Sequence, residues 1–159
     1  MEATRLTLGD GVTGVYVGED VASRACWAVR VGRRFSQERA AQALHEGPRA
    51  LPQGGITTAL VIQRAGGSEC TSAHFQQCCQ AMGQWVRCRV NQVGGRGVVE
   101  RLTRTFTYDV VFRPAVTTSL ELKALAPRFQ DWDNQERLHS RLGYQTPWQQ
   151  FLADAAVLT

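Results

Sequence analysis

Hydrophobic and polar side chains alternate in three segments near the start of the chain. The segments span residues 2–8, 12–18 and 25–31. Turn-forming residues separate them, at Gly9-Asp10-Gly11 and from Asp20 to Arg24. A period of two is the pattern of a half-buried strand, and glycine and aspartate are common in turns. The pattern therefore predicts an antiparallel meander of three strands.

The apolar spacing then changes to that of helices separated by single strands. Ser36 is a suitable N-cap and Gly47 a suitable stop for a helix over residues 37–46. Apolar residues from Ala59 to Ile62 predict a short buried strand, and the chain breaks after it at Gly66-Gly67. A second helix should follow Thr71 or Ser72 and end before Gly83, and a fifth strand should span residues 86–90.

The helix predicted over residues 97–112 has two different faces. Its apolar stripe consists of Val99, Leu102, Phe106 and Val110. A second face, at i+4 and i+7 spacing, carries Arg96, Glu100, Arg104 and Thr107. Taken alone, a glutamate among arginines is typical of a solvated face with weak salt bridges, so the spacing by itself favours a structural interpretation.

Two further helices are predicted near the carboxyl terminus. The first spans residues 118–132, and Pro127 should kink or split it because proline lacks the N–H donor. Thr146-Pro147 predicts a helix start for Trp148–Val157. No internal repeat or domain linker is present, so the 159 residues predict a single domain.

Arginine carries almost all of the positive charge. Of the 18 Lys and Arg residues all but Lys123 are Arg, and the net charge is +4. This charge suits a polyanionic partner without requiring one, because genome composition can also enrich arginine. The apolar and charged fractions, 43% and 20%, exclude a disordered chain. Without a signal peptide or an apolar run of membrane length, the expected location is cytoplasmic, with no membrane contact.

The five cysteines form no CxxC pair, which favours a reducing compartment. Cys70, His74 and Cys78 follow one another at i, i+4 and i+8, so a single helix could present them as three metal ligands. Free cysteine is also a common small core residue, and this second interpretation is the favoured one.

The segment DWDNQERLHSRLGYQTPWQQFL resembles the carboxyl-terminal end of the integrase catalytic core of bacterial insertion-sequence transposases. The family pattern is Tyr-Asn-x-x-Arg-x-His-Ser-x-Leu-Gly-Tyr-x-Thr-Pro. The matching residues are Asn134, Arg137, His139, Ser140, Leu142, Gly143, Tyr144, Thr146 and Pro147. Asp133 stands where tyrosine is usual.

Earlier segments carry the resemblance through nearly the whole chain. GGRGVVERLTRTFTYD resembles the helix with the third catalytic carboxylate, which assigns that role to Glu100, and EATRLTLGDG resembles the first strand, with Glu2-Ala3-Thr4 at the Asp-x-Thr position. GEDVASR and GGSECTSAHF resemble the turn after the second strand and the segment after the second catalytic Asp.

The resemblance implies an α/β protein with an RNase H-like fold, as in the DDE-type transposases and retroviral integrases. The expected sheet is mixed and five-stranded, with three antiparallel strands followed by two parallel ones, and helices flank it. Within the single domain, residues 1–115 should form the RNase H-like core and residues 116–159 a helical carboxyl-terminal part.

The family transfers DNA strands with two Mg²⁺ or Mn²⁺ ions held by three carboxylates. The resemblance therefore implies that Glu2 and Glu100 are catalytic and metal-binding. Ala65 occupies the position of the second Asp, and a methyl group cannot ligate a cation, so metal binding is expected to be weak or absent. Glu69 and Asp20 are the substitute acids that the sequence offers.

The same resemblance implies DNA as the partner, bound through arginine side chains. The candidates are Arg96, Arg101, Arg104, Arg137 and Arg141. Thr107 stands where a DNA-contacting lysine is typical, and the family's upstream helix-turn-helix region is not found in this sequence, so binding should be weak and non-specific. Transposases of this type act as multimers, so a homodimer or a full-length transposase is a further expected partner.

These observations lead to three hypotheses for the function. The first is a truncated, degenerate transposase core with little or no strand-transfer activity. The second is an active metal-dependent DNA phosphotransferase that uses a substitute acid, and the third is a non-catalytic module that binds nucleic acid or protein. The sequence favours the first, because Ala65 removes a metal ligand.

Overall fold

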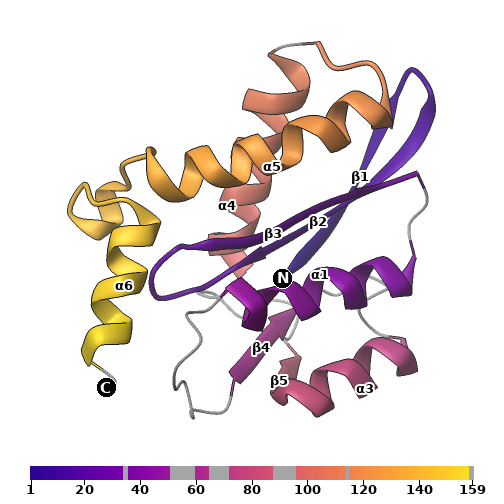
Figure 1. The fold of residues 1–159 in the computed structure, drawn as a ribbon. Helices are drawn as coiled ribbons and strands as arrows, with labels where there is room; N and C mark the ends of the chain where they lie inside the picture. The colour runs from indigo at the N-terminus through magenta and orange to yellow at the C-terminus, as the bar shows by residue number, and fades with distance from the viewer. Residues whose placement is uncertain (34–35, 51–59, 65–71, 88–95, 114, 158–159) are drawn as a thin grey trace.

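The computed structural model describes residues 1–33, 36–50, 60–64, 72–87, 96–113 and 115–157 (Figure 1). Five strands are present among them, namely β1 (Glu2–Leu8), β2 (Gly11–Glu19), β3 (Cys26–Gly32), β4 (Leu60–Arg64) and β5 (Gly83–Arg87). The helices are α1 (Gln37–Ala50), α3 (Ala73–Met82), α4 (Arg96–Phe106), α5 (Ser119–Gln135) and α6 (Pro147–Val157). A π-helical segment, η1 (Thr107–Phe112), continues α4, and a 3-10 turn, η2 (Ser140–Leu142), lies between α5 and α6.

The predicted meander is confirmed. Strands β1, β2 and β3 form an antiparallel sheet in that order, with Glu2 opposite Val17 and Leu8 opposite Gly11. Gly11 has a φ of 114°, a conformation that favours glycine after so tight a turn. A register shift between Gly18 and Glu19 ends the regular β2–β3 pairing, and it places Glu19 at the end of the strand beside the turn.

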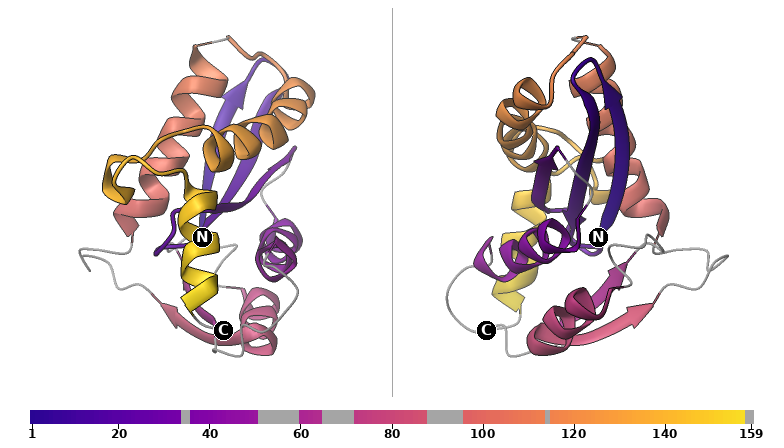
Figure 2. Two further views of the ribbon diagram at one scale, coloured as in Figure 1. Left: turned by 60° about the vertical axis from the view of Figure 1, so that its left-hand side comes forward. Right: turned by 90° about the vertical axis from the view of Figure 1, so that its right-hand side faces the viewer.

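Helices cover both faces of this sheet, as Figures 1 and 2 show. The core on one face joins β2 and β3 to α4, η1 and α5, and consists of Val15, Val17, Cys26, Val29, Val31, Leu102, Phe106, Val110, Val111, Leu122, Ala126 and Phe129. The core on the other face joins the sheet to α1 and α3 through Met1, Tyr16, Ala28, Ala40, Ala43, Leu44, Phe75 and Cys79. The apolar stripe predicted on the 97–112 helix therefore packs as expected.

Two expected boundaries and the expected sheet pairing differ from the structure. Helix α1 continues past Gly47 to Ala50, and β5 begins at Gly83 rather than near residue 86. Among the described residues, β4 and β5 pair in parallel with each other and not with the three-stranded sheet, so a single five-stranded sheet is not confirmed. Ala59 and the residues from 88 to 90 lie outside the described residues. Within the described part, no helix is long and apolar enough to cross a membrane.

Helix α5 starts as predicted but is not split at Pro127. Thr118 caps it, and Glu121 completes a capping box by accepting from the backbone of Thr118. The helix then runs unbroken from Ser119 to Gln135. Pro127 is exposed, so the carbonyl group that loses its helical donor lies on a face that water can reach.

Asn134 attaches α5 to the start of β3. Its Oδ1 accepts from the backbone N–H of Cys26 at 2.8 Å, and its Nδ2 donates to the carbonyl oxygen of Cys26 at 2.8 Å. Gln130 Nε2 donates to the same carbonyl at 3.1 Å. The asparagine of the family motif therefore has a structural role, since it satisfies both backbone groups of a buried strand residue.

Asn134→Ala is expected to lower the free energy of unfolding by about 2–3 kcal/mol, because it leaves a buried N–H of Cys26 without an acceptor and removes a second hydrogen bond. Urea unfolding followed by circular dichroism measures the change. Gln135→Ala, one residue further along at an exposed position, is the control and should cost less than 0.5 kcal/mol. Equal losses in the two variants would contradict the role given to Asn134.

Candidate functional site: an acidic pair and an arginine-lined cavity

The two predicted catalytic carboxylates lie on neighbouring elements. Glu2 is the first residue of β1, and Thr103 on α4 donates from Oγ1 to Glu2 Oε2 at 2.8 Å. Thr103 Oγ1 also lies 2.8 Å from the carbonyl oxygen of Val99 in its own helix, and the Thr103 side chain is buried. Glu100 is exposed one helical turn before Thr103. The structure therefore fixes the Glu2 carboxylate against α4, about one turn from Glu100.

The third position of the expected metal site lies outside the described residues. Strand β4 ends at Arg64, so Ala65 follows its carboxyl end directly, and Glu69 lies in the same undescribed segment. In the part of the chain that the structure describes, no group of three or more His, Cys, Asp or Glu side chains is arranged to hold a metal ion.

Asp20, the other substitute acid, belongs to the turn between β2 and β3. Its Oδ2 accepts from the backbone N–H of Ser23 at 2.8 Å and from Ser23 Oγ at 2.6 Å. The Asp20 carbonyl accepts from the N–H of Arg24, whose φ is 66°. The carboxylate therefore stabilises a turn that holds a non-glycine residue in the left-handed region, which favours the ordinary interpretation of Asp20 as a turn residue.

The predicted DNA-contacting arginines divide into two groups. Arg101, Arg137 and Arg141 line one cavity of about 440 Å³. Arg104 lies outside that cavity, with its guanidinium carbon 5.9 Å from the ring centroid of Tyr108, and Arg96 is the first residue of α4. Thr107, at the expected lysine position, donates to the carbonyl oxygen of Thr103 at 2.8 Å.

The structure adds three residues to this cavity that sequence reasoning missed as site residues. Glu19, Arg24 and His139 line it together with the three arginines and with Gly97, Val98 and Leu102 of α4. Arg24 lies in GEDVASR and His139 in the carboxyl-terminal motif, and both segments resemble the family without indicating a shared cavity. These lining residues meet only because the β2–β3 turn, α4 and the α5–α6 connection lie close together in the fold.

A buried polar cluster lies against the same cavity. Asp133 is fully buried, its Oδ1 accepts from Arg137 NH1 at 2.7 Å, and His139 Nε2 lies 3.7 Å from the same oxygen. Burial and the neighbouring Asp133 raise the pKa of Glu19 to about 8, against the opposing effect of Arg24, so this side chain is mostly uncharged at pH 7. Burial also raises the pKa of the Cys26 thiol, which therefore acts as a small core residue.

Three buried side-chain atoms in the described part lack a hydrogen-bond partner, and all three belong to this cluster. They are Glu19 Oε2, Asp133 Oδ2 and His139 Nε2. An unsatisfied buried polar group typically costs about 1–3 kcal/mol, so three of them at one place require an explanation.

The other residues of the carboxyl-terminal motif shape the connection between α5 and α6. The backbone N–H of His139 donates to Gln145, Tyr144 donates back to His139 at 3.0 Å, and Gly143 has a φ of 63°. Thr146 caps α6 by accepting from the N–H of Gln149 at 3.3 Å. The motif is thus mainly a folded connector that presents Arg137, His139 and Arg141 to the cavity.

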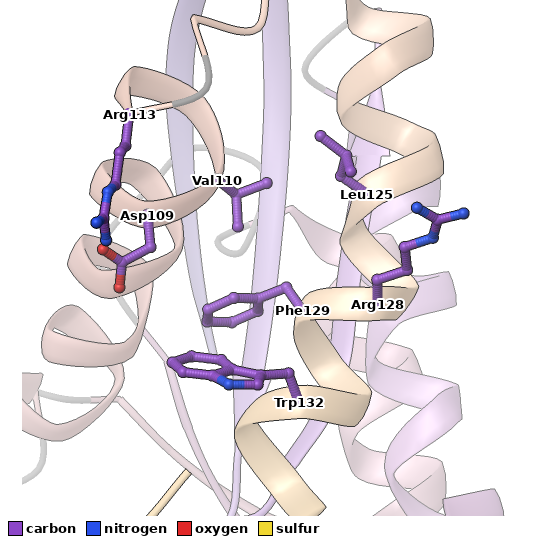
Figure 3. A pocket seen from close by; sticks show the side chains of 7 residues that line it. All are labelled: Asp109, Val110, Arg113, Leu125, Arg128, Phe129 and Trp132. Atoms are coloured by element: carbon purple, nitrogen blue, oxygen red, sulfur yellow. The ribbon is translucent and has the colours of Figure 1, made fainter. Parts of the chain in front are cut away.

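A second cavity, of about 320 Å³, lies between η1 and α5 (Figure 3). Phe129 and Trp132 form its wall on α5, with ring centroids 5.9 Å apart, and Arg113 and Arg128 lie at its edges. Asp109 is the one carboxylate among the described residues that line it, and these residues form no cluster suited to catalysis.

The cysteine and histidine pattern is described only in part. His74 and Cys78 lie on α3, with Nε2 and Sγ 4.0 Å apart, and Cys79 is buried in the core beside them. Cys70 lies outside the described residues, so three-ligand metal binding stays an untested possibility of the sequence, and Cys78 and Cys79 pack as apolar residues do.

Comparison with known proteins shows that the sequence and the fold are similar to those of one class of protein. Residues 83–147 match the family model described as "Integrase core domain", a segment that begins at β5 and ends at the start of α6. The structure superposes on the catalytic core domain of BIV integrase with a TM-score of 0.70 and 15% identity, covering 98% of this chain and 95% of that one. The chain has the integrase catalytic core fold.

Other integrase cores superpose with similar quality. The HTLV-2 integrase catalytic core in complex with magnesium, in a dimeric form, gives a TM-score of 0.64 at 17% identity, covering 94% of this chain and 91% of that one. A chain of the simian T-cell lymphotropic virus intasome in complex with PP2A regulatory subunit B56 gamma gives a TM-score of 0.70 at 16% identity, covering 94% of this chain and 52% of that one. Among curated proteins, no significant match was found. The resemblance to integrase cores with an RNase H-like fold is confirmed.

Proposed function

We propose that this integrase core is a relative of DNA transposases and integrases that binds DNA weakly through its arginines and has little or no strand-transfer activity. The observation that carries the proposal is the incomplete acidic set. Glu2 of β1 accepts a hydrogen bond from Thr103 of α4, and Glu100 lies one helical turn before Thr103, whereas the residue that follows β4 is Ala65. With one ligand replaced by a methyl group, these residues do not fit the two-ion chemistry of the class.

The arginines support DNA as the partner. Arg101, Arg104 and Arg141 are exposed, and within the described part none of them forms an ion pair with a carboxylate. Exposed guanidinium groups that are not neutralised by acids are suited to phosphate oxygens, and such contacts carry little sequence information. The HTLV-2 core occurs in dimeric and trimeric forms, and we propose that self-association gives this core a second DNA contact through the partner copy.

The DNA-binding test compares two double variants that lose the same charge. Arg101→Gln/Arg104→Gln removes two guanidinium groups from α4, whereas Arg113→Gln/Arg128→Gln removes two from the edges of the second cavity. The slope of log K against log salt for duplex DNA should become shallower by about 1.8 in the first variant and by less than 0.5 in the second. Fluorescence anisotropy at 50–200 mM salt measures both slopes, and equal slopes would refute a DNA contact on α4.

The catalytic part is tested on the unaltered chain. Plasmid nicking in Mg²⁺ or Mn²⁺ is expected to stay at the level of the Glu100→Gln variant. Metal-dependent nicking above that level would overturn the degenerate-site proposal and leave the fold assignment intact.

A further inference from the structure

The arginine-lined cavity is formed by three segments that are distant in the sequence. The end of β2 contributes Glu19 and the turn after it Arg24, and the first turns of α4 contribute Gly97 and Arg101. The connection between α5 and α6 contributes Arg137, His139 and Arg141. Its volume of about 440 Å³ lies in the range of small-molecule sites, and its concave shape suits one chemical group better than the long backbone of a duplex.

The lining charge is strongly unbalanced. Among the described residues that line the cavity, four are arginines and Glu19 is the only acid, and its burial keeps it mostly uncharged at pH 7. Arg137 is compensated by Asp133, but Arg101 and Arg141 form no ion pair with the described residues. Bringing guanidinium groups together without carboxylates is unfavourable unless an anion joins them.

Two of the three unsatisfied buried atoms, those of Glu19 and His139, point to the same ligand. Glu19 is only 9% exposed, and its Oε2 has no hydrogen-bond partner. His139 Nε2 is also buried and has no hydrogen-bond partner, although it lies 3.7 Å from Asp133 Oδ1, and both Glu19 and His139 line the cavity. A protonated carboxyl and an imidazole N–H can each donate to an anionic oxygen, and a bound oxyanion would satisfy both.

The start of α4 adds backbone donors. The first N–H groups of a helix have no acceptor within the helix, and Gly97 and Val98 line the cavity at that end. Apart from its chain neighbours and its own helix backbone, no atom of the described residues lies within 4 Å of a Cβ built on Gly97, so these residues leave space beside this backbone.

We propose that this cavity is a phosphate site, in which Arg24, Arg101 and Arg141 bind one phosphate group and His139 donates to it. The bound group is the phosphate of a nucleotide, either free or at the end of a nucleic-acid strand. This inference goes beyond the proposed function, because it concerns a single phosphate in a concave pocket and needs neither metal nor duplex binding.

Isothermal titration calorimetry tests the site with three probes: inorganic phosphate, a deoxynucleoside monophosphate and a trinucleotide with or without a 5′-phosphate. The phosphorylated trinucleotide should bind at least tenfold more tightly than the same trinucleotide without the phosphate. Equal affinities for these two would overturn the proposal, even if duplex DNA still binds. If the monophosphate binds as tightly as the phosphorylated trinucleotide, the ligand is a free nucleotide. If the phosphorylated trinucleotide binds more tightly than the monophosphate, the ligand is the end of a nucleic-acid strand.

The variants separate the cavity from the rest of the surface. Arg24→Gly should weaken phosphate binding at least tenfold, and glycine tolerates the φ of 66° that Arg24 adopts, so the turn is preserved. Arg141→Gln, at an exposed position, should give a similar loss and serves if Arg24→Gly fails to fold. Arg128→Gln removes the same charge outside the cavity and should leave binding within twofold. Equal effects of Arg141→Gln and Arg128→Gln would refute the assignment.

Discussion

Ala65→Asp is expected to raise metal-dependent nicking of plasmid DNA by about a thousandfold over the unaltered chain. The substitution returns a carboxylate to the residue that directly follows β4, where the second metal ligand of the family is expected. A ligand that contributes about 4 kcal/mol to stabilising the transition state changes the rate by about that factor. The measurement is the initial nicking rate in Mg²⁺ and in Mn²⁺, together with calorimetric binding of each ion.

Two controls make this result specific to the carboxylate. Ala65→Asn has nearly the shape of aspartate without its charge and should stay near the original rate. The nicking rate of Ala65→Asp/Glu100→Gln should also return to that of the unaltered chain, because the restored site requires the carboxylate of Glu100 as well. If the unaltered chain already nicks DNA as fast as Ala65→Asp, a different acid completes the site, and Glu69 is then the first residue to substitute, since Asp20 already holds the turn at Ser23.

The sequence predicted those parts of the fold that local patterns determine. The three-stranded meander, the buried stripe of α4, Ser72 as the residue that accepts from the N–H of Phe75, and the start of α6 are all found as expected. The errors lie where tertiary contacts decide. Strand β5 begins at Gly83 because that residue pairs with Leu60 of β4, and α5 continues through Pro127 because its proline faces water.

The candidate site was predictable only as separate residues. The family motif pointed to Glu2, Glu100 and the arginines, and the hydrogen bond between Glu2 and Thr103 agrees with an acid on β1 beside α4. Nothing local to Glu19 indicates that it is buried, because its environment depends on Asp133 and His139 at the far end of α5. A cavity lined by three distant segments has no signature in any one of them.

Glu19→Gln is expected to remove a fall in stability that the unaltered chain shows between about pH 4.5 and pH 8. The folded protein holds the Glu19 carboxyl protonated up to a pKa of about 8, mainly through burial, whereas the unfolded chain ionises near 4.5. In this window the folded state binds more protons than the unfolded state, so the free energy of unfolding decreases as the pH rises. The upper limit of the total decrease is about 5 kcal/mol, at 1.36 kcal/mol for each pH unit.

The groups around Glu19 shift its pKa in both directions, and the sum of their effects decides whether the pKa rises or falls. Arg24 and the amino terminus favour its ionised form, whereas Asp133 and Asp20 oppose it, and desolvation is the largest effect. Urea unfolding at pH 5.5, 7.0 and 8.5 measures the free energy of unfolding. This energy should change little with pH in Glu19→Gln and fall steeply as the pH rises in the unaltered chain.

Glu38→Gln is the matched control for this pH dependence. The pKa of Glu38 is lowered by hydrogen bonds from its own backbone and from Ser36, so its contribution is lost only as the pH falls below about 4.5. The free energy of unfolding of Glu38→Gln should therefore still fall steeply between pH 5.5 and 8.5. If the unaltered chain is equally stable at pH 5.5 and 8.5, Glu19 is ionised in the folded state, and the cavity then carries a negative charge that disfavours phosphate. The pH dependence of stability thus tests, without any ligand, the uncharged Glu19 on which the phosphate site depends.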